Sequence, residues 1–353
     1  MLRTWRQRVT FIDLVVWAIG LAIAVVVVVG TIKTLLSGKY TPVVWLDLFI
    51  RGLALGGVYA LIAMGYTLVY GILKMINFAH SEVFMSGPFT AVFLANALNR
   101  SGYMDQHPLL GMSLVTLLAM AVSMVIAILL ERIAYRPLRA APRLVPLITA
   151  IGASFFLQYA FRGLYGGGFQ AYPTLQILKS TIYFFGVNVS YTQLVVIAGA
   201  LLMMVVLYYI VQYTKIGKAM RAVSEDKEAA ELMGIDVDRV IVFTFGLGGA
   251  SAGFAGILFV LLFPIAWFFM GFIPSIKAFT AAVLGGIGNV AGAFVGAMIL
   301  GLLESLGPNL FLDGLGIPNA PQLKDAIAFV ILVFILIFRP SGILGEAITE
   351  TKA

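Results

Sequence analysis

The sequence is short of charge and of the residues that support thiol or metal chemistry. Only 11% of its 353 residues are charged, and it contains two histidines and no cysteine. The lack of cysteine excludes disulfide bonds and thiol catalysis, and a dedicated metal site is not expected from two histidines alone. There is also no G-x-x-x-x-G-K-[ST] segment, which excludes ATP binding through a P-loop. We therefore expect no metal and no cofactor on this chain.

Apolar residues, in contrast, make up 61% of the chain, and the mean hydropathy is +1.03. Soluble domains average about 45–50% apolar residues, so the composition indicates an integral membrane protein. We predict an all-α, polytopic bundle, since each spanning helix needs about 20 mostly apolar residues. The predicted full spans lie near residues 12–32, 49–73, 82–98, 110–131, 146–165, 192–213, 240–263 and 323–338.

One further apolar segment, near 276–306, is interrupted by glycines and is predicted to be re-entrant, as two half-helices that enter and return. Positive charge supports this topology, because Lys and Arg concentrate in cytoplasmic loops. With both termini cytoplasmic, fifteen of the 23 Lys and Arg residues lie inside and eight, Lys277 among them, lie outside or at the outer edge. The loop 305–322 has neither Lys nor Arg and is then outside. The net charge of +7 is explained by basic cytoplasmic loops and does not require a nucleic-acid partner.

A first polar constellation, Asn77, His80 and Glu82, lies where one apolar helix ends and the next begins. Polar groups at membrane depth are costly and face a cavity or a partner. The functional interpretation is a break that lines a translocation pathway. The alternative is an ordinary tight turn at the cytoplasmic surface.

A second break contains Gly285, Gly286, Gly288 and Asn289. Discontinuous helices near the bilayer midplane are common in transporters, so this break is also predicted to border a pathway.

Small residues recur at four-residue spacing, which lets helix backbones approach closely. The pattern occurs in Gly52/Gly56, in Gly249/Gly253 and in Gly288/Gly292/Gly296. The segment around Ser251 also matches G-x-S-x-G formally, but that hydrolase motif requires a strand-to-helix elbow and Ser251 lies in a predicted helix. An intramembrane hydrolase is therefore only a remote alternative.

The segment 217–237 is the most charged part of the chain and is predicted to be an amphipathic cytoplasmic helix, with Leu232 and Met233 on its apolar side. Five acidic residues fall between 225 and 236, and Gly234 is placed to end the helix in the left-handed conformation. A helix lying on lipid is the alternative, but such helices are usually basic, because acidic headgroups repel acidic side chains. A soluble protein partner fits the charge better.

Five motifs occur in a defined order from about Phe49 to Gly345. They are GGVYALIAMGYTLVYGILKMINFAHSEVFM (56–85), AYRPLR (134–139), GKAMRAVSEDKEAAELMGIDVDRV (217–240), LGGIGNVAGAFVGAMILGLLES (284–305) and FRPSGILG (338–345). In these motifs the chain resembles the permease subunits of branched-chain amino acid ABC importers. Permeases for urea and short-chain amides look alike, so that substrate class stays open. Ser81 departs from the family, which often has glycine at that position. Pro88-Phe89 is a second departure from the family pattern.

The resemblance implies a multi-pass protein of the plasma (inner) membrane that is not an enzyme. It also implies a second, related permease subunit, two ATP-binding subunits that hold the ATP, and an extracytoplasmic substrate-binding protein. The whole chain, 1–353, would form one permease domain, with 12–32 as an additional N-terminal helix. The segment 217–237 would be the coupling helix that docks on an ATPase. Its coupling residues would be Arg221, Glu228, Ala229, Ala230 and Gly234.

Overall fold

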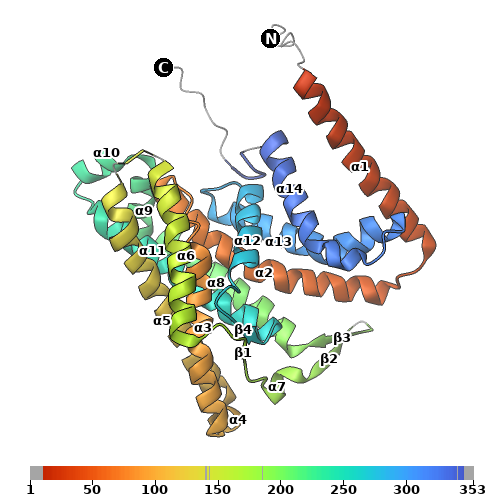
Figure 1. Ribbon diagram of the computed structural model, residues 1–353, viewed down its shortest axis with the longest axis horizontal. Helices are drawn as coiled ribbons and strands as arrows, with labels where there is room; N and C mark the ends of the chain where they lie inside the picture. Colours follow the sequence, from red (N-terminus) through yellow and green to blue (C-terminus); the bar gives the residue numbers. More distant parts are fainter. Residues whose placement is uncertain (1–10, 140, 143, 185, 340, 346–353) are drawn as a thin grey trace.

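The computed structural model describes residues 11–139, 141–142, 144–184, 186–339 and 341–345 (Figure 1). Long helices dominate these residues. The helices are α1 (Phe11–Ser37), α2 (Pro42–Leu73), α3 (His80–Arg100), α4 (Tyr103–Gln106), α5 (Pro108–Leu130), α6 (Leu144–Tyr165), α7 (Gln176–Lys179), α8 (Tyr191–Tyr213), α9 (Lys215–Glu225), α10 (Lys227–Leu232), α11 (Val237–Leu262), α12 (Phe272–Gly285), α13 (Val290–Gly307) and α14 (Lys324–Phe338).

Shorter elements complete the connections. They are the π-helical η1 (Glu131–Tyr135) and η3 (Pro308–Leu312), the 3₁₀ turns η2 (Arg136–Leu138), η4 (Asp313–Leu315) and η5 (Ala320–Leu323), and the strands β1 (Gln170–Ala171), β2 (Thr181–Phe184), β3 (Val187–Ser190) and β4 (Ile265–Ala266). Strand β1 pairs antiparallel with β4, and β2 with β3. These small sheets lie in the connections between helices, and the fold remains the predicted helical bundle.

Eight helical segments in the described part of the chain are long and apolar enough to cross a membrane, which confirms a polytopic bundle. Seven of them coincide with predicted spans. The eighth is residues 290–315, whereas the predicted span 82–98 lies in α3, which is too polar to be counted by composition. Helix α3 has 21 residues and is largely buried by its neighbours, so its polar side chains face protein.

Helices α12 and α13 form the predicted hairpin. Helix α12 begins just after β4, which pairs with β1, and α13 leads into η4, where Asp313 binds Lys39. The hairpin therefore returns to the end of the bundle at which it began, as predicted for a re-entrant segment. The two arms are unequal, which corrects the prediction of two half-helices. With 14 residues, α12 is about 21 Å long and too short to cross, whereas the second arm continues to Leu315.

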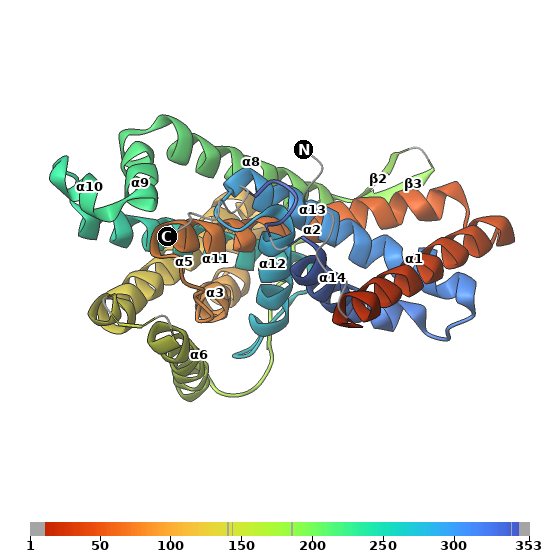
Figure 2. The same cartoon turned by 90° about the horizontal axis from the view of Figure 1, so that it is seen from above.

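The two ends of the bundle differ (Figure 1). Helices α9 and α10, the start of α1 and the end of α14 lie at one end, here called the α10 end. Seen from above in Figure 2, α9 and α10 lie at one side of the bundle and α1 at the other. Helices α4 and α7 and the short strands lie at the opposite α4 end. The terminal residues themselves lie outside the described part of the chain, but the described segments next to them share the α10 end, as the predicted topology requires.

Glycines bring the central helices together as their spacing predicts. A Cβ added at Gly301 of α13 would lie 2.4 Å from the Cα of Gly56 in α2. A Cβ at Gly253 of α11 would lie 2.5 Å from the carbonyl oxygen of Ala119 in α5. Any side chain at these positions would force the helices apart, so the glycines fix the α2–α13 and α5–α11 contacts. Gly288 differs, because no atom lies within 4 Å of its added Cβ.

Candidate functional site

The two predicted breaks lie beside each other, joined by an aromatic cluster on α2 and α12. The Tyr66 ring lies 4.7 Å from the ring of His80 and 6.1 Å from that of Phe279. Phe279 is also 6.1 Å from Phe78. Ile287, inside the second break, lines a small cavity together with Tyr66. The tertiary structure thus brings both breaks to one place, with Tyr66 between them.

The three polar residues of the first break, Asn77, His80 and Glu82, are buried by protein. Asn77 accepts a hydrogen bond of 2.6 Å from the Tyr135 hydroxyl. His80 is packed against α2 so closely that a Cβ at Gly65 would lie 2.4 Å from its Nε2, which has no partner among the described residues.

Glu82 is fully buried and its Oε1 atom accepts three hydrogen bonds. The donors are Gln158 at 2.8 Å, Ser81 at 2.9 Å and Ser154 at 3.0 Å. Two of these donors lie on α6, so Glu82 links α3 to α6 through a shared carboxylate. Three donors on one oxygen reduce the cost of burying the charge.

A cavity of about 350 Å³ lies beside this cluster. Its walls are mainly aromatic and aliphatic, and its polar groups are few, which is typical of small-molecule sites. The cavity is lined by Tyr66, Phe78, Ser81, Ile151, Ser154, Phe155, Gln158, Phe269, Phe272, Ser275 and Ile276. The three donors to Glu82 all line it, so the buried carboxylate lies directly behind the polar part of the cavity wall.

The second break is a tight turn that requires glycine. Gly286 and Gly288 have φ angles of +105° and +101°, which disfavour other residues. Asn289 caps α13 by accepting from Gly292 N at 3.0 Å, and its Nδ2 donates to Leu344 O at 2.9 Å. The backbone N–H of Leu344 in turn donates to Gly285 O at 3.0 Å. The turn is therefore held by the segment after α14, and Ile287 lines a small cavity together with Tyr66 and Phe279 of the aromatic cluster.

The predicted single helix of 217–237 is in fact two. Helix α9 ends at Glu225, and Asp226 has an extended backbone while its side chain accepts from Ala229 N at 3.0 Å, which starts α10. At the end of α10, Gly234 adopts the predicted left-handed conformation, with φ of +81°. The N–H groups of Gly234 and Ile235 donate to Glu231 and Ala230, as in a Schellman cap.

Helix α10 turns apolar side chains toward solvent. Leu232 is 89% exposed and Met233 is 82% exposed, although the sequence pattern placed both on the buried face. Glu228 and Ala229 are also exposed, and only Ala230 is buried. The tip of α10 therefore presents a mixed acidic and apolar surface, which we call the α10 tip (Glu228, Ala229, Glu231, Leu232 and Met233).

Arg221 points away from the α10 tip. Its guanidinium donates to the backbone oxygens of Val211 and Gln212, at the end of α8, where a positive charge is favourable. Arg221 thus joins the segment to α8 and does not belong to its exposed surface. Lys227 is also half-buried, and this burial, together with the charges of Arg139 and Lys74, lowers its pKa.

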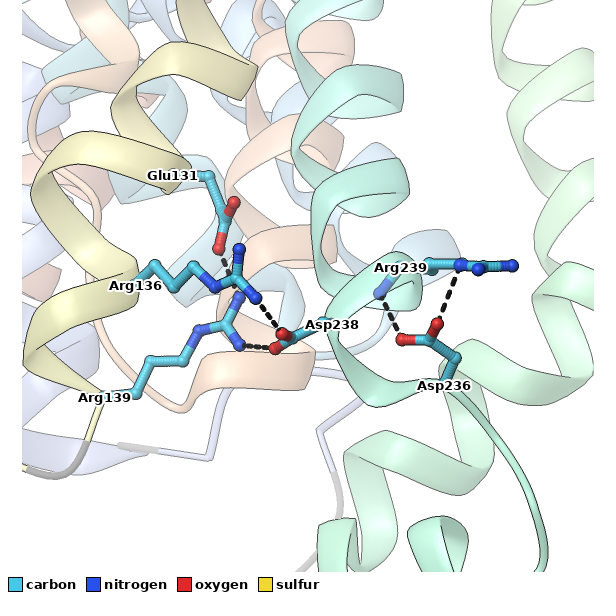
Figure 3. A network of polar contacts seen from close by, with 6 residues as sticks. All are labelled: Glu131, Arg136, Arg139, Asp236, Asp238 and Arg239. Carbon is cyan, nitrogen blue, oxygen red and sulfur yellow. Dashed lines mark hydrogen bonds and ion pairs between the residues drawn. The ribbon is translucent and has the colours of Figure 1, made fainter.

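An ionic network fastens α11 to the end of α5 (Figure 3). Arg139 binds both Glu131 and Asp238, and Arg136 also binds Asp238. Asp236, beside them, caps α11 by accepting from Arg239 N at 3.0 Å. The motif at 134–139 is thereby tied to the last residues of the motif at 217–240.

Sequence reasoning missed several residues of this site. Gln158 and Ser154 are polar residues inside the apolar helix α6, and polar groups inside a span are a signal for function that could have found them. Tyr66 carries no such signal, because an aromatic residue in an apolar helix is ordinary. Leu232 and Met233 were misplaced because one continuous helix was assumed.

The bundle, its buried polar breaks and its adjoining cavity define the class, a multi-pass membrane protein with the architecture of a transport permease. The chain belongs to the family described as branched-chain amino acid transport system, permease component, whose sequence model matches residues 48–336. As a member of this family, the chain is a component of a transporter complex. Helix α1 precedes the matched region.

Several curated relatives are similar over most of their length. The high-affinity branched-chain amino acid transport system permease protein BraD of Pseudomonas aeruginosa is 40% identical over 87% of this chain and 97% of its own. Its counterpart LivH of Escherichia coli is 38% identical, with the same coverage of both chains. A probable LivH of Methanocaldococcus jannaschii is 28% identical over 81% of this chain and 88% of its own. No solved structure matches the chain.

Proposed function

We propose that this chain is the permease subunit of an ATP-driven importer for branched-chain amino acids. The similarity to BraD, 40% identity over 97% of that protein, carries this proposal. The importer would contain a second, related permease subunit, two ATP-binding subunits and an extracytoplasmic substrate-binding protein. ATP would bind to the partner subunits, since this sequence has no P-loop.

The substrate pathway would pass beside Asn77, His80 and Glu82. The cavity of about 350 Å³ next to Glu82 is large enough for a small amino acid, and its aromatic walls suit an aliphatic side chain. The glycine turn at 285–289 would act on this pathway through Ile287 and the aromatic cluster. Gly285, Gly286, Gly288 and Asn289 would then shape the end of the pathway without contacting substrate.

Coupling to the ATPases would use the α10 tip. An exposed apolar pair flanked by carboxylates suits a protein interface better than a lipid surface, because anionic headgroups repel carboxylates. Motion of the segment would reach α8 through Arg221, and α11 through the cap at Gly234 and the short connection to Asp236. Through these links, closure of the ATPases would open the pathway alternately to each side of the membrane.

The substrate is tested by uptake into proteoliposomes that contain the assembled complex and its binding protein. We expect ATP-dependent uptake of leucine and valine and no uptake when the permease is reconstituted alone. Radiolabelled urea and acetamide form the second arm of the experiment. Uptake of urea without uptake of leucine would show that the substrate is urea and not a branched-chain amino acid. ATP-dependent uptake by the permease alone would refute the proposal that separate subunits supply the ATPase activity.

The coupling surface is tested by Leu232→Asp and Glu228→Lys. Both residues are exposed, so the folded permease should change by no more than about 0.5 kcal/mol. Either change should abolish co-purification of the ATPases and uptake together. Glu228→Lys opposes an interfacial charge, which costs about 2–5 kcal/mol, and Leu232→Asp places an unpaired carboxylate where an apolar side chain would be buried. Asp105→Lys, a charge reversal on exposed α4 at the opposite end, is the matched control and should transport normally.

A further inference from the structure

A groove of about 630 Å³ runs between α5 and α11, from the α10 end toward the middle of the bundle, and is here called the α5–α11 groove. Its α5 side changes from apolar to basic toward the α10 end. The lining residues on this side are four positions apart: Met124, Ile128, Arg132 and Arg136. This spacing places them in one stripe of the continuous segment 108–138. The groove shares no residue with the cavity beside Glu82.

The α11 side of the groove changes in the same way. Arg239 lies in the first turn of α11, and Phe243, Gly246, Leu247 and Ala250 follow it along the groove. Arg239 and Ala250 are eleven residues apart, which is about 17 Å along a helix. The hydrocarbon core of a bilayer is about 30 Å thick, so one leaflet of it is about 15 Å deep. The groove is therefore about as long as one leaflet is deep.

The basic end of the groove lies at the boundary of the bilayer. Charged side chains are costly within hydrocarbon, so the hydrocarbon region ends near Arg132 on the α5 side. Val125, Leu129 and Ile133, each one position after a residue of the α5 stripe, are apolar and exposed. Such side chains on a spanning segment contact acyl chains. The arginines are thus at the level of lipid headgroups, and the apolar part of the groove is at the level of the chains.

The rim of the groove carries one positive charge in excess, because three arginines and two aspartates line it. Arg136 binds Asp238, and Arg239 binds Asp236 at 2.7 Å (Figure 3). Arg132 is exposed, and its side chain forms no ion pair or hydrogen bond within the part of the chain that the structure describes. The groove therefore attracts a single negative charge.

The paired arginines also keep donors for an anion. A guanidinium has five N–H donors. Arg136 donates one hydrogen bond, from Nη2 to Asp238, and about half of its side chain is exposed. The side chain of Arg239 is almost fully exposed. Because the planar fork of a guanidinium matches phosphate oxygens, Arg132, Arg136 and Arg239 together suit a phosphate group.

We propose that the α5–α11 groove binds a phospholipid with a net negative charge. Its phosphate lies among Arg132, Arg136 and Arg239, and one acyl chain lies over Gly246 and Ala250, whose small side chains leave room for it. The lipid bridges the end of α5 and the start of α11 beside their ionic network and so stabilises that contact. It comes from the leaflet at the α10 end, which the proposed function makes the inner leaflet. Binding itself does not depend on which compound the permease transports.

Binding is tested by native mass spectrometry on the permease together with the subunits that co-purify with it. Dioleoyl-phosphatidylglycerol, which is anionic, is compared with dioleoyl-phosphatidylcholine, which has the same chains and no net charge. We expect the phosphatidylglycerol to bind about fivefold more tightly, because a basic side chain at the bilayer surface contributes about this factor toward an anionic lipid. Equal affinities for the two lipids would overturn the proposal.

Variants locate the binding. Arg132→Gln removes the unpaired charge and should weaken phosphatidylglycerol about fivefold, to near the affinity of phosphatidylcholine. Ala250→Leu fills the apolar part of the groove and should weaken both lipids severalfold. Arg100→Gln is the matched control, because Arg100 is an exposed arginine at the end of α3, at the α4 end of the bundle, and it should leave both affinities unchanged. An equal loss in Arg100→Gln and Arg132→Gln would reduce the effect to general charge attraction and overturn the site.

Thermal unfolding in detergent micelles gives a second measurement, which decides the matter if Ala250→Leu fails to fold. Phosphatidylglycerol should raise the Tm of the permease more than phosphatidylcholine does, since a ligand that binds only the folded state stabilises it. Arg132→Gln should remove this difference and leave the lipid-free Tm unchanged, because the Arg132 side chain is exposed. A difference that persists in Arg132→Gln would overturn the proposal.

The other candidate occupant of the groove is a partner subunit. If Arg132→Gln releases a co-purifying subunit and leaves lipid binding unchanged, the groove is a protein interface and the proposal is wrong. Uptake by the reconstituted complex is measured separately, so a failure of lipid binding is distinguished from a failure of the proposed transport function.

Discussion

Two ionic networks connect helices of this protein, one near the α4 end and one at the α10 end, and each combines a buried pair with a more exposed one. In the first, Lys277 binds Glu304 and Asp325 and joins α12, α13 and α14. In the second, Arg139 and Arg136 bind Asp238, and Arg139 also binds Glu131, as Figure 3 shows. The first uses one cation for two anions, whereas the second uses two cations for two anions.

The difference indicates which ion pairs can open during a transport cycle. The Lys277 and Glu304 side chains are 4% and 1% exposed, so breaking their pair leaves charges in a low-dielectric interior. The Arg136 and Asp238 side chains are 52% and 46% exposed, so water can replace their contact. We therefore expect the Lys277–Glu304 pair to be a fixed joint of the hairpin and the Arg136–Asp238 pair to permit motion of α11.

The largest effect is expected for Lys277→Met, which leaves the buried Glu304 without its cation. Removing one partner of a buried ion pair costs about 3–5 kcal/mol. The unfolding of the purified permease in detergent, followed by tryptophan fluorescence against denaturant, measures the loss. The triple variant with Glu304→Gln and Asp325→Asn should recover much of it, and a failure to recover would show that packing and not charge is responsible.

A smaller loss is expected for Arg139→Met. Arg139 is the only ionic partner of the fully buried Glu131 within the described residues, but its own side chain is 19% exposed. The cost should fall near the lower limit for a buried pair, about 3 kcal/mol. The same denaturation measurement applies, with Arg132→Met on the exposed side of η1 as its control. If the two variants are equally stable, the ion pair between Arg139 and Glu131 does not contribute to the stability of the fold.

The smallest effect in the absence of added salt is expected for Arg136→Gln. Its ion pair with Asp238 is exposed, and Arg139 keeps Asp238 paired, so the change should cost no more than about 1 kcal/mol. Raising the salt concentration to about 1 M, where the Debye length is about 3 Å, should erase even this difference. A loss above about 2 kcal/mol would contradict the distinction between the two networks.

The topology gives a further prediction that does not concern stability. The chain contains no cysteine, so single cysteines at Asn309 and Ser341 can be labelled without background. The two positions lie at the α4 and α10 ends, respectively, and should react with an impermeant maleimide from opposite sides of the membrane. Labelling from the same side would refute the re-entrant hairpin.

Much of the fold follows from sequence because its rules are local. About 20 apolar residues must form a helix in a membrane, which gave seven of the eight candidate spans. Gly234 was predicted to be left-handed because glycine after a helical pattern reports its own backbone conformation. For the polar break at 77–82 the sequence left two interpretations open, a pathway lining and a tight turn at the cytoplasmic surface, because the cost of polar groups in lipid does not fix their depth.

The arrangement of the site could not be predicted in this way. The pairing of Lys277 with Glu304 joins residues on separate helices, and no local pattern indicated that Lys277 would be buried in protein. The break between α9 and α10 depends on one capping side chain, Asp226, within an otherwise helical pattern. That break decides that Leu232 and Met233 face solvent.

The sequence by itself determined that this protein crosses the membrane many times, which segments do so, and to which family it is similar. Hydropathy, glycine spacing and ordered motifs are properties of the chain and do not depend on which helices become neighbours. Only the tertiary structure decided that Tyr66 joins two breaks some 200 residues apart, that α6 supplies donors to Glu82, and that Lys277 pairs with the buried Glu304. These features arise from packing, because any apolar helix can cover another until specific close contacts select its neighbours.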